Sequence, residues 1–360
     1  MARASTQHGR AVQYGKTQTQ TVVLIAVCCL YMRMALELTG CAHARPLVLA
    51  TPIRAAVIRT AWAAGFQLDL FCVLEHCGSS PIGPIEDAIR GFVAAFLKAS
   101  AGHSPHVQGC DALHRNISVI DEDSRRRARG DQSQAPKAGF LRPEFRAEHP
   151  YYPPHDLHRG SYSVDNTLNA WNKLRMVGEM RRGYGRYDVV WRARPDYTTR
   201  RYDWPLVLRA RHRLREQQHG AIGAAASRRP EPSYIVPAGA ADGYHTDNEA
   251  LLLSEAAADH YDRVWSGVAS LYGAPCRVVR GCRDKGRFAK KCGKEPPGVN
   301  MTRVVFWPEQ LITEHMNAGG FRAHELNVYL VACKPIGASY NASASNAAGC
   351  ATYWTHPCQW

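Results

Sequence analysis

The most informative stretch of this 360-residue chain is Gly183–Arg200, with the sequence GYGRYDVVWRARPDYTTR. Its apolar part, Tyr187–Ala193, predicts a buried β-strand. Pro195 ends that strand, because proline has no N–H to donate to a neighbouring strand. In open α/β sheets, ligands bind outside the carboxyl ends of the strands. Asp196 is therefore predicted to stand at a ligand-binding edge.

The charged residues around this predicted strand end suit an anionic ligand or a metal ion. Arg192 and Arg194 can bind phosphate oxygens through two parallel hydrogen bonds each. The Asp196 carboxylate can coordinate a divalent cation. A salt bridge between Asp196 and Arg194 with a purely structural role is an equally supported interpretation of the same spacing.

The first half of the chain alternates strand-like and helix-like segments. Pro46–Thr51 and Gln67–Leu74 are short apolar runs typical of buried strands, and Asn116–Ile120 predicts a third strand. Ile53–Ala64 and Pro84–Lys98 carry apolar residues at helical spacing. This alternation predicts an α/β fold with a mainly parallel, Rossmann-type sheet flanked by helices.

The second half continues with helices and extended segments that are separated by polar stretches. Capping residues, glycines and apolar periodicity mark their ends. Helices are predicted at Val164–Arg182, Asn248–Tyr261 and from Pro308 to Gly319, and extended segments at Tyr234–Val236, Val304–Phe306 and Phe321–Ala332.

A basic flank followed by an apolar run characterises the N-terminus. Residues 1–20 contain three basic residues and no acidic one, and Thr21–Met32 reads TVVLIAVCCLYM. This layout is typical of a secretory signal peptide or a signal anchor. We expect a signal anchor over residues 21–44, with residues 1–20 as a cytoplasmic tail. The alternatives are a signal peptide cleaved at the small-residue pattern Ala42–Ala44 and a buried helix of a soluble protein.

Sequons and cysteines favour the lumen of the secretory pathway. Asn116, Asn300 and Asn341 each begin an Asn-x-Ser/Thr acceptor sequence. Two of the 12 cysteines lie in the apolar run, and the others are an even number, which is compatible with several disulfides. Three cysteines between residues 276 and 292 are not spaced like usual zinc ligands. We expect a single-pass type II protein of the Golgi or endoplasmic reticulum membrane or, alternatively, a secreted protein.

The expected domain organisation follows from these segments. A catalytic domain is expected over residues 45–335, followed by a cysteine-containing tail over residues 336–360. Loop insertions are predicted at residues 121–150, 209–232 and 276–299, which are rich in charge, proline or glycine.

The net charge of +14 is concentrated in a few segments. Residues 1–20, 200–232 and 276–296 carry the excess of basic residues, and the rest of the chain is neutral on balance. The basic N-terminus fits the positive-inside rule. The other two segments are interpreted as loops that are solvated or that meet anionic acceptors or donor phosphates. Nucleic-acid binding is the alternative, and no recognised binding motif supports it.

The segment Tyr187–Asp196 resembles the Tyr-Asp–hydrophobic–Arg-x-Arg-Pro-Asp signature of a loosely characterised family of GT-A-like nucleotide-sugar glycosyltransferases. The resemblance extends in patches over residues 46–332. Trp171–Lys173 resembles the helix before the signature, His245–Asn248 an Asp-Asn step with its following helix, and Phe306–Leu311 a closing Pro-Glu-x-x-Leu helix. The resemblance implies a GT-A fold and a sugar nucleotide as the donor.

The same resemblance implies a metal site. Asp196 stands where the family's metal-binding Asp-x-Asp motif ends, so it would coordinate Mn2+ or Mg2+ bridged to the donor diphosphate. Arg194 replaces the first Asp of that motif. The alternative is therefore that Arg192 and Arg194 bind the nucleotide and neutralise its diphosphate themselves.

Further residues receive roles from the resemblance. Trp171, Lys173 and Asn248 are expected to contact the nucleotide, although such a tryptophan is more often a core residue. Asp247 and Glu309 are the candidates for the general base that deprotonates the acceptor hydroxyl. The alternatives are that Asp247 only caps a helix and that Glu309 only complements a helix dipole.

These observations predict a membrane-anchored glycosyltransferase with a nucleotide-sugar donor, a glycan or glycoprotein acceptor and no nucleic-acid partner. An inactive glycosyltransferase-like binding protein is the alternative, because the first Asp of the metal motif is missing. The chain has no P-loop sequence, which argues against P-loop kinases and NTPases. It also has no G-x-S-x-G nucleophile elbow.

Overall fold

The computed structural model describes the part of the chain that carries a central sheet and its flanking helices. The strand predicted at Val304–Phe306 and the loop predicted at 276–299 lie outside the described residues and stay predictions. The described residues are 31–76, 81–100, 103–114, 117–119, 121, 141–146, 164–218, 232–237, 249–267, 308–326, 329–333 and 351–354.

The secondary structure alternates between strands and helices along most of the described chain. The elements are β1 (Met32–Ala42), α1 (Ala44–Ala63), β2 (Phe66–His76), α2 (Ile82–Ala99), β3 (Val107–Gln108), β4 (Leu113–His114), α4 (Pro143–Arg146), α5 (Val164–Tyr184), β5 (Val189–Ala193), β6 (Tyr197–Thr199), α6 (Trp204–Gln218), β7 (Tyr234–Pro237), β8 (Glu249–Leu252), α7 (Glu255–Asp262), α10 (Pro308–Ala318), β9 (Ala323–Leu326), β10 (Tyr329–Ala332) and β11 (Ala351–Trp354).

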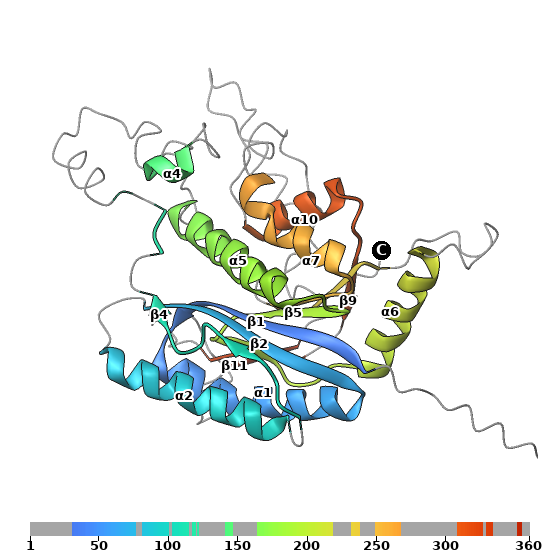
Figure 1. Cartoon of the computed structure of the whole chain (residues 1–360), viewed down its shortest axis with the longest axis horizontal. Coiled ribbons are helices and arrows are strands. Elements are labelled where there is room, and N and C mark those ends of the chain that lie inside the picture. The colour runs from blue at the N-terminus through green and yellow to red at the C-terminus, as the bar shows by residue number, and fades with distance from the viewer. Residues whose placement is uncertain are drawn as a thin grey trace, which may run out of the picture. The chain divides into compact units, whose positions relative to one another are not determined.

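An eight-stranded sheet lies at the centre, in the order β3-β2-β1-β5-β8-β7-β9, with β4 also paired to β2. β1 runs parallel to β2 on one side and to β5 on the other, whereas β8 runs antiparallel to β5 and β7. Helices α1 and α2 cover one face, and α5, α7 and α10 lie on the other (Figure 1). This mixed, mostly parallel sheet flanked by helices confirms the predicted α/β class.

The hydrophobic core has two layers, one on each face of the sheet. In β1, Leu36 packs in the layer of α1 and α2, whereas Ala35 packs in the layer of α5 and α7. In β5, Trp191 and Val190 are divided in the same way. Because successive side chains of a strand point to opposite faces, Arg192 shares the α5 face with Val190.

The central strand β1 corrects the predicted N-terminal organisation. The signal anchor predicted over residues 21–44 is wrong for residues 32–42, which form β1 in the middle of the sheet. The domain therefore begins before residue 45. Residues 21–30 lie outside the described part. None of the helices in that part combines the length and the apolar character that crossing a bilayer requires.

Ion pairs explain how charged residues fit inside this apolar strand. The Arg33 Nη2 atom lies 3.0 Å from Asp69 Oδ2 on β2, and the Glu37 Oε1 atom accepts a 2.8 Å hydrogen bond from Arg181 Nε on α5. A buried charge is tolerated when it is paired and hydrogen-bonded. Both partners lie far along the chain, so the local sequence gives no sign of them.

The strand predicted at Pro46–Thr51 is wrong, because these residues belong to α1. Pro46 lies in the first turn of α1, where a missing N–H breaks no intrahelical hydrogen bond. The buried strand expected to open the domain is β1 instead. The helix predicted at Ile53–Ala64 is confirmed as the second part of α1.

The polar insertion predicted over residues 209–232 is wrong for residues 209–218, which continue α6. Val207, Ala210 and Leu214 are buried at helical spacing on the side of α1 and α2. Four arginines that alternate through this helix hide its narrow apolar stripe. Residues 219–231 lie outside the described part.

The helix predicted at Asn248–Tyr261 is wrong for residues 249–252, which form the antiparallel strand β8. Leu251 and Leu252 point into opposite core layers, as expected of a strand. The helix begins only at α7, where the Ser254 side chain accepts a hydrogen bond of 3.1 Å from the Ala257 N–H.

Two short strands replace the one predicted at Asn116–Ile120. β3 and β4 pair with β2, whereas residues 117–119 are irregular. The segments predicted at Gln67–Leu74 and Pro84–Lys98 are confirmed as β2 and α2. The elements expected over Val164–Arg182, Tyr187–Ala193, Tyr234–Val236 and from Pro308 are confirmed as α5, β5, β7 and α10.

A second, three-stranded sheet has the order β11-β10-β6 and joins the C-terminal tail to the segment after β5. The extended stretch predicted at Phe321–Ala332 becomes β9 and β10, and β11 lies within the predicted tail. A disulfide joins Cys72 on β2 to Cys110. Cys41 and Cys333 are disulfide-bonded as well. The expectation of disulfides is therefore confirmed.

Candidate functional site

The carboxyl ends of β1 and β5 lie side by side at the point where the strand order reverses. From β1 the chain proceeds to β2 and β3 on one side and reaches β5 on the other. A Cβ on Gly40 would lie 3.1 Å from the Pro195 Cδ atom, and Gly40 has a φ of +141°. Glycine therefore allows the two strand ends to approach closely. Such a reversal point is where open α/β sheets bind ligands.

The Arg194–Asp196 turn follows β5 directly at this edge. The Nε and Nη2 atoms of Arg194 donate hydrogen bonds of 3.0 and 3.1 Å to the two carboxylate oxygens of Asp196. This bidentate pair uses both oxygens of a carboxylate that is almost completely buried. The structure thus contains the salt bridge that the sequence offered as an alternative to a metal site.

Arg54 on α1 holds the same turn from the opposite face. Its Nη2 atom donates hydrogen bonds of 2.7 and 2.6 Å to the carbonyl oxygens of Arg194 and Tyr197. The Cys333 N–H donates a 2.9 Å bond to the Asp196 carbonyl oxygen. Burial lowers the pKa of Arg54 to about 10, although the negative charges of Glu249 and Asp196 act to raise it. The turn is therefore fixed by two elements that are remote in sequence.

Glu249 is a fully buried carboxylate at the start of β8, opposite Ala193. It accepts a 2.7 Å bond from Trp191 Nε1 and a 2.6 Å bond from the Thr199 hydroxyl. Burial is the main cause that raises its pKa. Sequence analysis missed both Glu249 and Arg54, although Glu249 directly follows the predicted site residue Asn248.

Arg192 lies on the other face of the sheet, beneath α5. It is 4% exposed, and its Nε and Nη1 atoms have no hydrogen-bond partner in the described part of the chain. Its register neighbour on β1 is Glu37, whose Oε1 atom already accepts the bond from Arg181. Buried donors without a partner are costly, so such a group calls for an explanation.

Lys173 on α5 brings a second cation to this edge. Its ammonium forms an ion pair with the carboxylate of Glu75, near the carboxyl end of β2. Burial is the largest cause that lowers the pKa of Lys173, Glu75 opposes it, and the charges of Arg194 and Arg192 lower it further. Three basic side chains therefore lie within electrostatic range of one another beside the reversal point.

The other sequence-predicted residues fall in three groups. Trp171 is buried in the core layer under α5, in agreement with its alternative role as a core residue. Asp247 and Asn248 lie outside the described residues. Glu309 lies in the first turn of α10, and its side chain is outside the described set.

The described residues do not provide a set of ligands for the predicted metal ion. Among them, no three His, Cys, Asp or Glu side chains lie close enough together to hold a metal ion. Both oxygens of Asp196 accept hydrogen bonds from Arg194, and Glu249 is held by Trp191 and Thr199. The described residues thus do not fit Mn2+ or Mg2+, and the metal stays a prediction.

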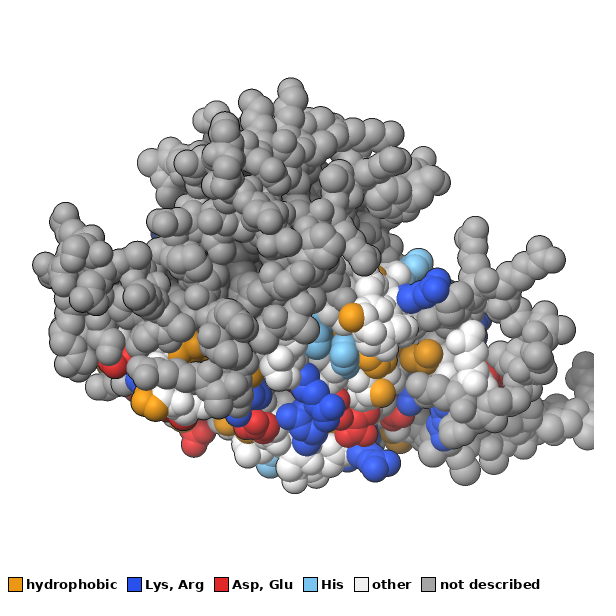
Figure 2. Space-filling view, turned by 90° about the horizontal axis from the view of Figure 1, so that it is seen from above, with side chains coloured by type: hydrophobic (Ala, Val, Ile, Leu, Met, Phe, Trp, Pro, Cys, Tyr) orange, Lys and Arg blue, Asp and Glu red, His pale blue; other side chains and the backbone are white. Residues whose placement is uncertain are grey.

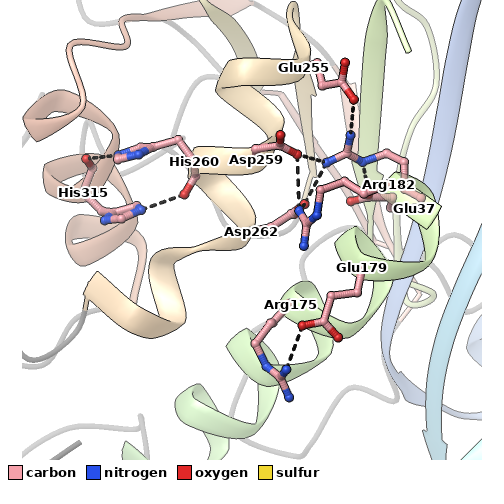
Figure 3. A network of polar contacts seen from close by, with 10 residues as sticks. Glu37, Arg175, Glu179, Arg182, Glu255, Asp259, His260, Asp262 and His315 are labelled. Carbon is pink, nitrogen blue, oxygen red and sulfur yellow. Dashed lines mark hydrogen bonds and ion pairs between the residues drawn. The ribbon is translucent and has the colours of Figure 1, made fainter. Parts of the chain in front are cut away.

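A network of charged side chains on the α5 face connects Glu37 of β1 with α5 and α7 (Figure 3). Its centre is the fully buried guanidinium of Arg181, which contacts Glu37, Asp259 and Asp262 at 2.7–3.0 Å. Burial is the main cause that raises the pKa of Asp262. These contacts connect β1, α5 and α7, so the network holds α5 in the position that presents Lys173.

The described surface on the side of α5, α7 and α10 carries mixed charge. Basic and acidic side chains stand next to one another there, rather than in one basic patch (Figure 2). This part of the surface therefore does not favour the nucleic-acid alternative.

Comparison with known proteins does not identify a family for this chain, so a function is argued from the site. The chain matches no protein-family model, and no curated protein is significantly similar to it.

Proposed function

We propose that the chain is a glycosyltransferase of the GT-A type, which moves a sugar from a nucleotide-sugar donor to a hydroxyl of a glycan or protein. The observation that carries the proposal is the convergence of Arg192, Lys173 and the Arg194–Asp196 turn beside the carboxyl ends of β1 and β5. That place is the nucleotide-binding crevice of open α/β sheets.

The chemistry of sugar transfer suits these side chains. The acceptor oxygen bonds to the anomeric carbon while the bond from that carbon to the diphosphate breaks, and the acceptor proton passes to a base. Fixed positive charge stabilises the negative charge that develops on the leaving diphosphate. Asp247 and Glu309 remain the proposed bases. Asp247 comes two residues before Glu249, which is paired with Ala193 at the end of β5.

We also propose that the folded domain lies in the lumen of the secretory pathway. The Cys72–Cys110 disulfide supports an oxidising compartment. Cleavage of a signal peptide at Ala42–Ala44 would remove β1, an interior strand of the sheet that pairs with both β2 and β5. The position of β1 therefore favours an uncleaved anchor, or cleavage before residue 32, in the Golgi or endoplasmic reticulum.

Release of nucleotide from a panel of UDP- and GDP-sugars tests the proposed transfer. The full chain, expressed through the secretory pathway, is expected to release the nucleotide from one donor in the presence of a glycan or glycoprotein acceptor. Asp196→Ala is expected to lower that rate by about 100-fold or more, because it removes the anchor of the Arg194 guanidinium. Arg186→Ala, at a 93% exposed side chain, is the matched control and leaves the rate unchanged.

An inactive binding protein is the second candidate, because both Asp196 oxygens are already bonded in the fold. In that case, a sugar nucleotide raises the unfolding temperature without being turned over. Transfer that persists in Asp196→Ala would contradict the site assignment. If no donor is bound or turned over, the glycosyltransferase proposal itself fails.

A further inference from the structure

We infer that the Arg192 guanidinium is the direct ligand of the donor's diphosphate and that this binding needs no divalent cation. Asp196 then acts as a positioning residue that orients Arg194, rather than as a metal ligand. This inference rests on the proposed function, because it names how the same site holds its substrate.

The first step is the unsatisfied state of Arg192. The side chain is almost fully buried, and its Nε and Nη1 atoms have no hydrogen-bond partner among the described residues. These donors lie on different edges of the planar guanidinium, because the Nε–H is parallel to an N–H of Nη2 and not to one of Nη1. Each donor can therefore bind a separate anionic oxygen. A bound anion would therefore satisfy donors that the described fold leaves open.

The second step is the charge balance at the strand ends. Lys173 is paired with Glu75, and Arg194 is paired with Asp196. The acidic register neighbour of Arg192 is Glu37, whose Oε1 atom lies 2.8 Å from Arg181 Nε and whose Oε2 atom has no hydrogen-bond partner among the described residues. Burial raises the pKa of Glu37, and the charges of Arg181 and Arg192 oppose that rise.

Like Arg54, Arg192 thus makes no direct ion pair with a described residue, and it shares the charge of Glu37 with Arg181, while Lys173 and Arg194 add to its field. An anionic ligand balances such an excess, and its attraction is strong where water is largely excluded.

The third step concerns Asp196. Its two oxygens accept bonds from Arg194, and the turn that carries it is held by Arg54 and by the Cys333 N–H. Coordinating a metal would require Asp196 to give up at least one of these charge-assisted bonds. Glu249, the other described carboxylate beside the turn, is held by Trp191 and Thr199 on the opposite face from Arg192.

Calorimetric titration of the full chain with UDP and with GDP separates guanidinium from metal binding. One nucleotide is expected to bind in the presence of EDTA with a Kd within about twofold of its value in Mn2+ or Mg2+. Arg192→Met is expected to weaken that binding about 10- to 100-fold, because charge-assisted hydrogen bonds are lost. Arg192→Lys keeps the charge without the planar guanidinium, so its loss is intermediate.

Thermal unfolding of the unliganded variants guards against a mere folding defect. Arg192→Met removes buried donors without partners, so its unfolding temperature is expected to equal or exceed that of the parent chain. Arg186→Met, at the 93% exposed site, is the matched control and should bind nucleotide as the parent chain does.

The outcomes separate this inference from the proposed function. Binding that appears only with Mn2+ or Mg2+ would overturn the inference and leave the glycosyltransferase proposal standing. A folded Arg192→Met variant that binds nucleotide as well as the parent chain would also overturn it. If neither nucleotide binds under any condition, both the proposed function and the inference fail.

Discussion

The guanidinium of Arg181 connects three elements of the fold. It is fully buried and lies between Glu37 on β1 and the two aspartates of α7, Asp259 and Asp262. Removing one partner of a buried ion pair destabilises a protein strongly, because the other partner remains as an uncompensated buried charge. The position of α5, and with it that of Lys173, therefore depends on this one side chain.

Removal of the Arg181 charge is predicted to destabilise the protein strongly. Arg181→Met should lower the free energy of unfolding at about pH 7 by about 3–5 kcal/mol, because Glu37 loses its ion pair and Asp262 keeps only the one with Arg182, at 3.4 Å. Burial raises the pKa of both groups. A raised folded-state pKa means that stability is recovered as the pH falls, so the deficit should shrink toward about pH 5.

Denaturant unfolding at both pH values measures this effect. The control is Arg175→Met on the same helix, since Arg175 pairs with Glu179 at 2.8 Å in a more exposed position (Figure 3). Such surface pairs contribute about 0.2–1 kcal/mol. Equal losses in the two variants would show that the buried network does not stabilise the fold.

At the same scale, the sequence predicts several residues of the candidate site but not the partners that hold them. Arg192, Arg194, Asp196 and Lys173 could be predicted because they lie in a strand end and a helix with clear local patterns. Their partners could not, because a contact such as that of Arg54 with the Arg194 carbonyl joins residues 140 positions apart. Nothing local distinguishes Arg54 from a solvated arginine on α1.

At the scale of secondary-structure elements, two histidines connect α7 with α10 (Figure 3). The ring of His260 lies within 2.8 Å of the His315 carbonyl oxygen, and the ring of His315 within 2.7 Å of the His260 carbonyl oxygen. The rings are stacked with centroids 4.0 Å apart. Burial is the main cause that lowers the pKa of His315 to about 4.

Acid is predicted to loosen this helix pair. A folded-state pKa below the ordinary value of about 6.5 means that the contribution of His315 is fully present above about pH 6.5 and is lost as the pH falls toward 4. The difference of about 2.5 pKa units corresponds to about 3 kcal/mol.

Unfolding free energies of the parent chain and of His315→Gln, measured across this range, isolate the effect. The parent chain should lose about 2–3 kcal/mol more than the variant, because Gln cannot be protonated. Parallel curves for the two proteins would mean that His315 does not control the acid response.

At the scale of the whole molecule, the Cys72–Cys110 disulfide ties the sheet to the segment after α2. Its cysteines are separated by 38 residues. Closing a loop of this length in the unfolded chain is worth about 3–4 kcal/mol. The double variant Cys72→Ala and Cys110→Ala is therefore predicted to unfold at lower denaturant, with that loss of free energy.

The single variant Cys72→Ala is the control for this prediction. It breaks the same disulfide, so its loss should approach that of the double variant, and the difference reports packing alone. A double variant within about 0.5 kcal/mol of the parent chain would show that the disulfide does not constrain the unfolded state.

The α/β class, the strand that ends at Ala193 and the helix before it follow from the sequence, because apolar periodicity, proline and glycine act over a few residues. Other features depend on the tertiary structure, because they require long-range pairing. Only strand pairing shows that Met32–Ala42 is an interior strand of the sheet rather than part of an anchor. The same packing buries Arg192 with its Nε and Nη1 atoms unbonded, because Arg181 of α5 binds one oxygen of Glu37, the neighbour of Arg192 on β1.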